Sequence, residues 1–472
     1  MKVEQIYTNC LAHGAYYIES NGEAAIIDPL REVQQYIDLA ESKGAKIKYV
    51  LETHFHADFV SGHKDLAAKT GAKIVYGPTE RETGFEFKSA EDNEILELGN
   101  VKIKVLHTPG HTPESSCFLL IDENGKDHSI YTGDTLFIGD VGRPDLAQKV
   151  DDSLTQDKLA RMLFHSLRNK IMPLNDDIIV YPGHGAGSAC GKNMSKETFD
   201  TLGNQKATNY ALRADMTEEE FVTELLDGLT EPPAYFPQNV VMNIVGYESI
   251  DKVLSQATTA HPVPEFEALV EEKEAMIIDT RNEKEFVQGF IPGSIFIGID
   301  GNFATWVGTV VKDVQTPIVF IADEGREEEI ATRFARVGFD NVLGYLKGGF
   351  HAWRNAGKKF NTIESVEAST VTSDVLETAV LADVRKESEY ESQHVENAMN
   401  APLDYFEDSK AKFNKGETYY VHCAGGYRSV IFASLMNKAG FENLINVEGG
   451  FKALEAAGKL PTTEYVCPTT LL

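Results

Sequence analysis

A repeat in the second half of the chain limits the fold more than any other feature of the sequence. Three short landmarks recur in the same order, about 100 residues apart, as two copies of one structural unit would: Asp279-Thr280-Arg281 and Asp383-Val384-Arg385, Gly338-Phe339 and Gly440-Phe441, and Gly348-Gly349-Phe350 and Gly449-Gly450-Phe451. Two homologous modules explain this pattern, and we place them at residues 255–360 and 362–472.

Both modules alternate short apolar runs with stretches that have helical character. One run ends at Ile278 and its counterpart ends at Ala382, while the segment from Arg428 to Lys438 has the polar start of a helix. This alternation predicts an α/β sheet with crossover helices in each module. The Pro-rich segment 231–237 precedes the repeat and indicates a boundary, so we expect a first domain at residues 1–235.

Charge and cysteine content narrow the class of protein. The chain has 73 acidic and 44 basic residues, a net charge of −29, so we expect it to bind neither nucleic acid nor a membrane. Five widely spaced cysteines without a Cys-x-x-Cys pair argue for a reducing compartment. Without a secretory leader or an apolar run that could span a membrane, we expect a cytoplasmic protein. A homo-oligomer is expected because most soluble assemblies are symmetric.

Four predicted strands of the first domain end in loops that carry histidine or aspartate. The donors in these loops are His54, His56 and Asp58 after the first strand, then His111, Asp134 and His184. A single histidine of this kind is as often a surface or core residue as a ligand. Because loops at one edge of a rigid sheet can assemble a site, the set together predicts a metal centre.

The order His54-x-His56-x-Asp58, Gly110-His111, Gly133-Asp134 and Gly183-His184 resembles the metallo-β-lactamase superfamily. The resemblance implies an N-terminal αββα sandwich. The sequence departs from the family pattern at Phe59, where two-metal members have a histidine. Phenylalanine has no lone pair to donate, so a second metal would lose a ligand and we expect one metal.

The mono-iron branch of that family, the persulfide dioxygenases, is the more similar one. This resemblance implies one Fe(II) per chain held by His54, His111 and Asp134, a ligand set suited to non-haem iron with open positions. His56, Asp58 and His184 then become residues that orient ligands or carry protons. Zinc is the alternative metal.

Two further segments look like that branch. In Gly142-Arg143-Pro144-Asp145-Leu146 the arginine could equally tie a turn to a carboxylate. Cys190 follows His184 in a Gly-rich loop and is either a persulfide acceptor near the metal or a small residue that fills the loop. Cys117 lies in an apolar run and is expected in the core.

The last module carries a thiol in a tight loop. An apolar run ends at His422-Cys423-Ala424-Gly425-Gly426-Tyr427-Arg428, and a helix is expected to follow. Inward-facing N–H groups, a helix N-terminus and Arg428 would all stabilise a negatively charged sulfur. The segment resembles the active-site loop of rhodanese-type sulfurtransferases, which implies Cys423 as nucleophile and Arg428 as its cationic neighbour.

The middle module lacks this thiol. Asp323 stands where the nucleophile would be, and Gly289 is matched to His394 of the last module. A carboxylate cannot carry sulfane sulfur and would repel anionic sulfur species. We therefore expect this module to be inactive in sulfur transfer and to act as a spacer or as a dimerisation or docking surface.

The whole chain resembles bacterial persulfide dioxygenase–rhodanese fusions. That resemblance implies oxidation of a low-molecular-weight thiol persulfide by O2 to sulfite, and transfer of sulfane sulfur at Cys423 that makes or uses thiosulfate. One alternative is a zinc-dependent thioester hydrolase of the glyoxalase II type fused to a sulfurtransferase. Another is a non-enzymatic sulfur carrier or sensor. The sequence does not identify the thiol.

Overall fold

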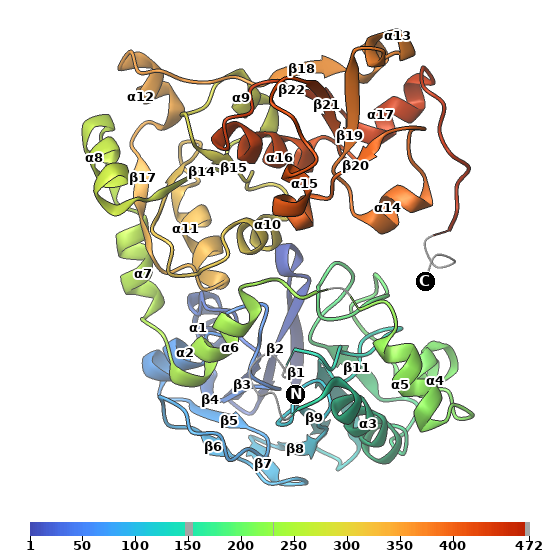
Figure 1. Ribbon diagram of the computed structural model, residues 1–472. Coiled ribbons are helices and arrows are strands. Elements are labelled where there is room, and N and C mark those ends of the chain that lie inside the picture. The colour runs from blue at the N-terminus through green and yellow to red at the C-terminus, as the bar shows by residue number, and fades with distance from the viewer. Residues whose placement is uncertain (147–153, 230, 468–472) are drawn as a thin grey trace. The chain divides into compact units, whose positions relative to one another are not determined.

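Four sheets organise the chain in the computed structural model, which describes residues 1–146, 154–229 and 231–467 (Figure 1). The chain divides into two units. The first comprises Met1–Val253 with the short segments Lys312–Val314 and Phe334–Asp340. The second comprises Leu254–Val311, Gln315–Arg333 and Asn341–Leu472, and therefore contains most of both repeated modules.

Two six-stranded sheets form the centre of the first unit. The first sheet has its strands in chain order: β1 (Lys2–Thr8), β2 (His13–Ser20), β3 (Glu23–Ile27), β4 (Lys46–Leu51), β5 (Lys73–Tyr76) and β6 (Lys88–Ser89). The second also keeps neighbours in chain order: β7 (Ile95–Leu98), β8 (Val101–His107), β9 (Ser116–Ile121), β10 (Asp127–Gly133), β11 (Ile179–Pro182) and β12 (Asp200–Thr201).

Alternation of side chains along the strands makes this unit a four-layer sandwich. In β2, Tyr16 and Ile18 face the second sheet, whereas Ala15 and Tyr17 face the helices on the outer side. Period-two alternation of buried residues on both faces is what a sheet covered on both sides requires. The expected αββα architecture is confirmed.

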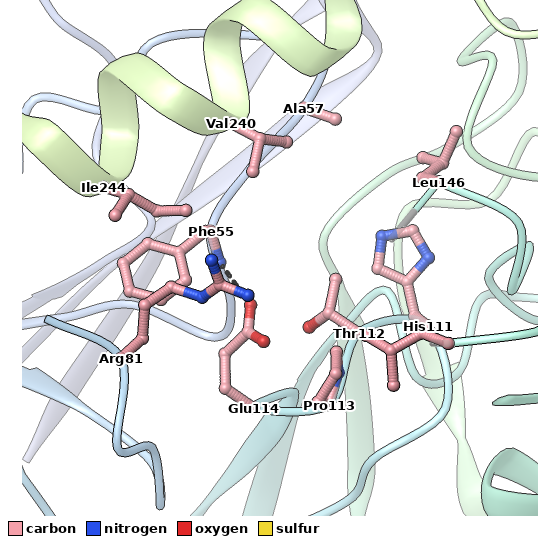
Figure 2. A pocket seen from close by; sticks show the side chains of 11 residues that line it. Phe55, Ala57, Arg81, His111, Thr112, Pro113, Glu114, Leu146, Val240 and Ile244 are labelled. Atoms are coloured by element: carbon pink, nitrogen blue, oxygen red, sulfur yellow. Dashed lines mark hydrogen bonds between the residues drawn. The ribbon is translucent and has the colours of Figure 1, made fainter. Parts of the chain in front are cut away.

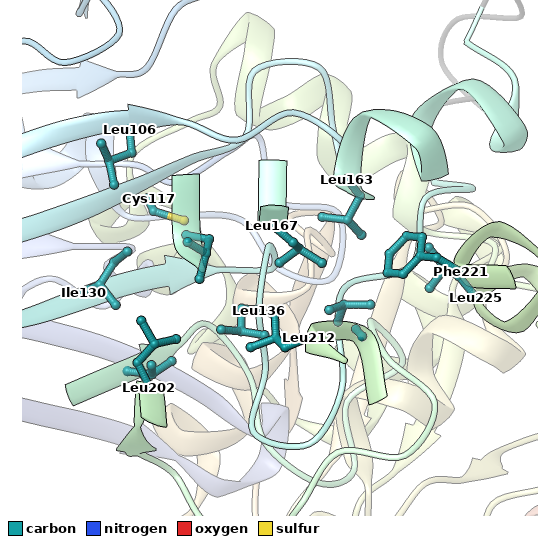
Figure 3. Close-up of a cluster of buried hydrophobic side chains, with 14 of the residues drawn as sticks. Leu106, Cys117, Ile130, Leu136, Leu163, Leu167, Leu202, Leu212, Phe221 and Leu225 are labelled. Carbon is teal, nitrogen blue, oxygen red and sulfur yellow. The ribbon is translucent and has the colours of Figure 1, made fainter. Parts of the chain in front are cut away.

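Helices cover the outer faces of both sheets. They are α1 (Gln34–Ser42) and α2 (His63–Thr70) on the first sheet, and α3 (Gln156–Ser166), α4 (Leu202–Thr208) and α5 (Glu218–Leu226) on the second. Figure 3 shows the core beneath the second group, where Leu163 and Leu167 meet Leu136 and Phe221. Cys117 is fully buried in this core, as expected from its apolar run.

The Pro-rich segment lies within the first unit rather than at its end. Helix α6 (Phe236–Val245) starts there, and its Asn243 side chain donates hydrogen bonds to the carbonyls of His56 and Phe59 at 2.8 and 2.9 Å. The unit continues to Val253. Proline at the start of a helix is favourable, so this Pro-rich turn begins a helix that completes the first unit.

The second unit contains two five-stranded sheets with the same strand order. The first runs β13 (Ala260–His261), β17 (Val342–Leu346), β16 (Ile318–Ile321), β14 (Met276–Asp279) and β15 (Ile295–Phe296). The second runs β18 (Glu364–Glu367), β22 (Leu444–Glu448), β21 (Thr418–His422), β19 (Ala379–Asp383) and β20 (Met399–Asn400). All these neighbours pair in parallel, so the repeat in the sequence is a repeat in topology.

The connections are helical, as the alternation predicts. In the middle module and the segment just before it, the helices are α7 (Ile250–Ala257), α8 (Val263–Lys273), α9 (Glu283–Gln288), α10 (Phe303–Val310), α11 (Glu327–Arg336) and α12 (Gly349–Asn355). In the last module they are α13 (Ser373–Leu376), α14 (Glu387–Ser392), α15 (Phe406–Lys410), α16 (Tyr427–Lys438) and α17 (Gly450–Ala457).

One buried ion pair explains why the landmarks recur together. Arg385 bonds the Asp383 carboxylate with Nη2 at 2.6 Å and lies 4.2 Å from the ring centroid of Phe451. Arg281 makes the same contacts with Asp279, at 2.6 Å, and with Phe350, at 4.4 Å. The aspartate, the arginine and the Gly-Gly-Phe turn are therefore parts of one interaction, which ties β19 to α17 in one module and β14 to α12 in the other.

The same pair corrects one detail of the sequence alignment. Arg281 also donates to the carbonyl of Gly289 at 2.9 Å, and Arg385 donates to that of Gln393 at 2.8 Å. Gly289 is thus equivalent to Gln393, and Phe290 rather than Gly289 stands at the place of His394. Matching by sequence alone was off by one position because a short loop carries no periodicity.

Among the described residues, no helix is both long and apolar enough to cross a membrane.

The packing of α3 against α5 gives a test of the first core. Phe221 is fully buried and its ring lies 5.5 Å from that of Phe164. We expect Phe221→Ala to lower the free energy of unfolding by about 3–5 kcal/mol, because the core cannot close over the cavity. Urea denaturation followed by circular dichroism measures it. Phe199→Ala, at a side chain 55% exposed, is the control, and an equal loss there would contradict this assignment of the core.

Candidate metal centre and candidate thiol site

The predicted donors meet where strands of both sheets end. His54 follows β4, Asp134 follows β10, and His111 lies in the loop after β8. One nitrogen of each histidine and one oxygen of Asp134 all lie within 4.8 Å of one another. His111 Nε2 is 3.5 Å from Asp134 Oδ2. The structure therefore brings the expected ligand set together.

Hydrogen bonds on the far side of each imidazole fix its orientation. His111 Nδ1 donates to the carbonyl of Arg143 at 2.8 Å, and His54 Nδ1 lies 3.0 Å from the hydroxyl of Thr53. Nδ1 of each ring is thus occupied, and Nε2 of His111 faces Asp134, the arrangement that metal-binding histidines use. Arg143 itself grips Asp145 through Nε and Nη2, both at 2.6 Å, so the predicted arginine-tied turn is present and it positions His111.

Two glycines allow this close approach. A Cβ at Gly142 would lie 2.0 Å from the carbonyl oxygen of Asp134 and 3.0 Å from His111 Nδ1. A Cβ at Gly183 would lie 2.7 Å from Asp134 Oδ1. Any side chain at these positions would push the donors apart.

The electrostatics of the cluster fit a bound cation. Burial lowers the pKa of His111 to about 4 and that of His54 well below its usual value, so both rings are neutral and have a lone pair to donate. Burial, helped by the charge of Asp58, raises the pKa of Asp134 well above its usual range. Neither Asp134 oxygen accepts an N–H or O–H hydrogen bond from a described residue; the neutral thiol of Cys190 is the hydrogen-bonding side chain beside the carboxylate. A buried carboxylate in this state lacks a positive partner, and a divalent metal would supply one.

A second group of donors adjoins the first. His56, Asp58 and His184 also have donor atoms within 4.8 Å of one another. His184 Nε2 lies 3.4 Å from Asp58 Oδ2 and 3.6 Å from Asp134 Oδ1. Phe59 is fully buried against the ring of His56, at 4.3 Å, and adds no donor. Asp134 thus has one oxygen toward each group.

One carboxylate in contact with this cluster, Asp28, is not among the residues predicted from the sequence. Asp28 follows β3, and it accepts hydrogen bonds from the N–H of Thr53 at 2.8 Å and from its hydroxyl at 2.9 Å. His56 Nε2 lies 3.1 Å from Asp28 Oδ1. Asp28 has a φ of 48°, which is uncommon outside glycine. The rule of strand ends that found the other donors also applies to this residue.

His13 was missed for a different reason. Its ring lies among the cluster, 5.3 Å from that of His184, and Nε2 donates to the carbonyl of Asp28 at 2.8 Å. It comes at the start of β2 rather than after a strand, so no pattern in the sequence indicated it.

Cys190 lies beside the metal cluster. Its sulfur belongs to a group with Asp134 and His184 whose donor atoms lie within 4.8 Å of one another. The side chain is buried, and burial together with the charges of Asp58 and Asp134 raises the pKa of the thiol well above its usual value. The structure does not distinguish a persulfide acceptor from a small residue that fills the loop. It does place the thiol next to the metal ligands.

A small, mainly apolar pocket opens onto His111 (Figure 2). Phe55 forms part of its wall, and Val240 and Ile244 of α6 line it from above in the view of Figure 2. Arg81 and Glu114 are its charged residues; Glu114 accepts a hydrogen bond from the N–H of Phe55 at 3.1 Å, whereas Arg81 is exposed. The pocket thus presents one accessible cation to a molecule bound at His111.

The thiol of the last module lies between β21 and α16, as expected. Cys423 is 1% exposed, and the N–H of Gly426 donates to its Sγ at 3.1 Å. Gly426 has a φ of 106°, a backbone conformation that glycine tolerates, and this lets the loop turn its N–H inward. The side chain of Arg428 bonds Glu389 through both terminal nitrogens, at 2.6 and 2.8 Å. Glu389 belongs to the repeated segment whose sequence resembles the rhodanese pattern, but that pattern did not indicate its pairing with Arg428.

The corresponding loop of the middle module carries different side chains. Asp323 follows β16 and is exposed, and Arg326 pairs with Asp300 at 2.8 Å. The chain has no cysteine between Cys190 and Cys423, so no thiol of this module could replace Asp323.

Family models match both units. Residues 9–184 match the metallo-beta-lactamase superfamily, and residues 263–356 and 370–457 each match the rhodanese-like domain. The hydroxyacylglutathione hydrolase GloC of Haemophilus influenzae is 32% identical over 198 residues, which cover 37% of this chain and 86% of that protein. The mitochondrial persulfide dioxygenase ETHE1 of Bos taurus is 30% identical over 214 residues, covering 44% and 73%.

A solved structure extends the likeness beyond the first unit. The metallo-beta-lactamase from Staphylococcus aureus is 33% identical, with a TM-score of 0.65, and the match covers 73% of this chain and 98% of that one. The first unit makes up little more than half of the present chain. The similarity therefore includes both the sandwich and part of the second unit.

Metal content tests the ligand set. We expect His54→Ala to weaken metal binding at least about 100-fold, because even residues that only support ligands contribute 10- to 100-fold. Metal analysis after dialysis against a weak chelator measures it. His165→Ala, at a side chain 58% exposed on α3, should keep the full stoichiometry. Unchanged metal content in the folded His54→Ala protein would remove His54 from the site.

Proposed function

Because the chain belongs to the metallo-beta-lactamase superfamily and carries two rhodanese-like domains, we propose that it is a persulfide dioxygenase coupled to a sulfurtransferase. The observation that supports this most is the group of His54, His111 and Asp134, two neutral imidazoles and one buried carboxylate, in the same chain as the Cys423 loop. Two histidines and a carboxylate are the donor set of non-haem iron oxygenases. We propose one Fe(II) per chain.

The proposed reaction is the oxidation of a low-molecular-weight thiol persulfide. It balances as R–S–SH + O2 + H2O giving R–SH, sulfite and two protons. When bound, Fe(II) would hold the persulfide sulfur and dioxygen next to each other.

The chain's own residues position the substrate in this scheme. The apolar pocket at His111 takes the body of the thiol, and Arg81 attracts a carboxylate of its non-reacting part. His56, Asp58 and His184 border the metal site and hold its polar groups in place, with Asp28 beneath them. Cys190 is a candidate acceptor for sulfur near the metal.

We further propose that Cys423 carries sulfane sulfur to sulfite, which makes thiosulfate, or in the reverse direction from thiosulfate to a thiol. The inward N–H of Gly426 and the nearby charge of Arg428, paired to Glu389, stabilise the anionic sulfur species. The module with Asp323 takes no part as a nucleophile. Because the product of each active domain is a substrate of the other, fusion raises the effective concentration of both.

A second candidate is a zinc-dependent thioester hydrolase. It is favoured by the adjoining donors His56, Asp58 and His184, which together with Asp134 could hold a second metal. Its weakness is Phe59, which removes a ligand from the second site. Metal analysis of protein purified without oxygen decides: about one iron per chain supports the dioxygenase, and two zinc ions per chain would overturn it.

Loss of His111 should separate the two activities. We expect His111→Ala to reduce oxygen uptake with a thiol persulfide at least about 100-fold, because the metal loses a ligand. Thiosulfate chemistry at Cys423 should remain at the wild-type rate. An oxygen electrode and a sulfite assay measure the two activities, and loss of both in well-folded protein would refute separate sites.

The reciprocal variant tests the thiol. Cys423→Ser should abolish sulfur transfer while oxygen uptake is unchanged, because a hydroxyl cannot form a persulfide. Cys117→Ser is the matched control, and Cys190→Ser tests the other candidate thiol. Sulfur transfer that persists in Cys423→Ser and disappears in Cys190→Ser would assign the nucleophile to the first domain instead.

A further inference from the structure

The Cys423 loop opens onto a cavity that the inactive module helps to form. The cavity has a volume of about 680 Å³ and is bounded by Gly425 and Gly426 of the loop. Part of its lining comes from α9 of the other rhodanese-like module, through Glu283, Lys284 and Val287. Because Gly426 contacts the sulfur directly, a molecule in this cavity lies next to the nucleophile.

The two modules of the second unit are joined at this loop. Tyr427, the residue after Gly426, donates from its hydroxyl to the carbonyl of Gly298 at 2.6 Å, and its ring lies 5.3 Å from that of Phe296. A Cβ at Gly301 would come within 2.3 Å of the tyrosine ring. The middle module therefore packs closely around Tyr427. This contact holds the residues that the module contributes to the cavity in a fixed position next to the Cys423 loop.

The charge of the cavity is mainly negative. Glu283, Glu367 and Glu448 line it together with a single cation, Lys284. Among the described residues none of these three carboxylates has an ion-pair partner, and Glu367 and Glu448 are exposed to the space. With this balance of charge, the cavity favours a cationic ligand over an anionic one of similar size.

The remaining lining suits a short organic molecule. Val287, Ala453 and Ala457 are apolar, and Asn446 is the one buried polar residue of the group, held by Ser429 at 2.8 Å. The cavity lining therefore combines apolar side chains with carboxylates.

We propose that this cavity binds the small-molecule thiol partner of Cys423 and selects thiols that carry a protonated amino group. The inference rests on the proposed sulfur transfer and adds the class of its substrate. In the step, the thiolate R–S⁻ attacks the outer sulfur of the Cys423 persulfide, the S–S bond breaks, and its electron pair returns to Sγ. The products are R–S–SH and the Cys423 thiolate, and the reverse step loads Cys423 through the same contacts.

A panel of thiols that differ in charge tests the proposal on the full-length protein. Cys423 is loaded from thiosulfate, and kcat/KM is measured for cysteamine, 2-mercaptoethanol and 3-mercaptopropionate as acceptors. The double variant Glu367→Gln/Glu448→Gln should reduce the preference for cysteamine over 3-mercaptopropionate by about tenfold at low salt, because two charges close to the amine are removed. Intrinsic thiol reactivities cancel in the comparison with wild type.

Two further variants test whether the residues that line the cavity cause the preference for cysteamine. Glu442→Gln, at an exposed glutamate outside the cavity lining, should leave the preference unchanged. Lys284→Gln should increase the preference for cysteamine about threefold, because it removes the cation contributed by the inactive module. A preference that responds to neither the double variant nor Lys284→Gln would overturn the proposal while leaving sulfur transfer intact. Failure of thiosulfate to load Cys423, seen by mass spectrometry, would instead overturn the sulfur transfer and this inference with it.

Discussion

The cost of burying a carboxylate without a counter-charge governs the first domain. Asp134 is enclosed at the edge of the second sheet and surrounded by imidazoles that burial keeps neutral. The described residues give its oxygens no N–H or O–H donor, only the neutral thiol of Cys190. Such a group destabilises a fold unless a cation neutralises it. Thr53, Arg143 and the glycines of the loops all serve the geometry of this one cluster, so the sandwich is in effect a support for a metal.

The second unit also buries carboxylates, but there arginine side chains of the protein neutralise them. Asp383 and Asp279 are buried as deeply, but each is neutralised by an arginine two residues later that also bonds a carbonyl and stacks on a phenylalanine. These internal pairs leave no demand for a ligand. They are retained in the module without a nucleophile, which explains how it keeps its fold and topology while Asp323 replaces the thiol.

The two candidate sites differ in charge, and this difference limits which charged groups a thiol that binds at both sites would carry. The pocket at His111 exposes Arg81, whereas the cavity at the Cys423 loop is lined by Glu367 and Glu448. Under the proposed function, one molecule that carries both a carboxylate and an ammonium group could satisfy each site in turn. Under the same proposal the middle module has a role in recognition, because residues of α9 line the second site.

Sequence by itself determined the features that depend on neighbouring residues. Alternation of apolar side chains predicted the strands, the residues after strand ends gave His54, His111 and Asp134, and the recurring Asp-x-Arg predicted the second module. Tertiary structure alone decided contacts between distant segments: Asp28 beneath His56, the pairing of Arg428 with Glu389, and Lys284 beside the Cys423 loop. Strand periodicity is a local property of the backbone, but which side chains meet across loops is set by packing of whole elements, and that packing leaves no periodic trace in the sequence.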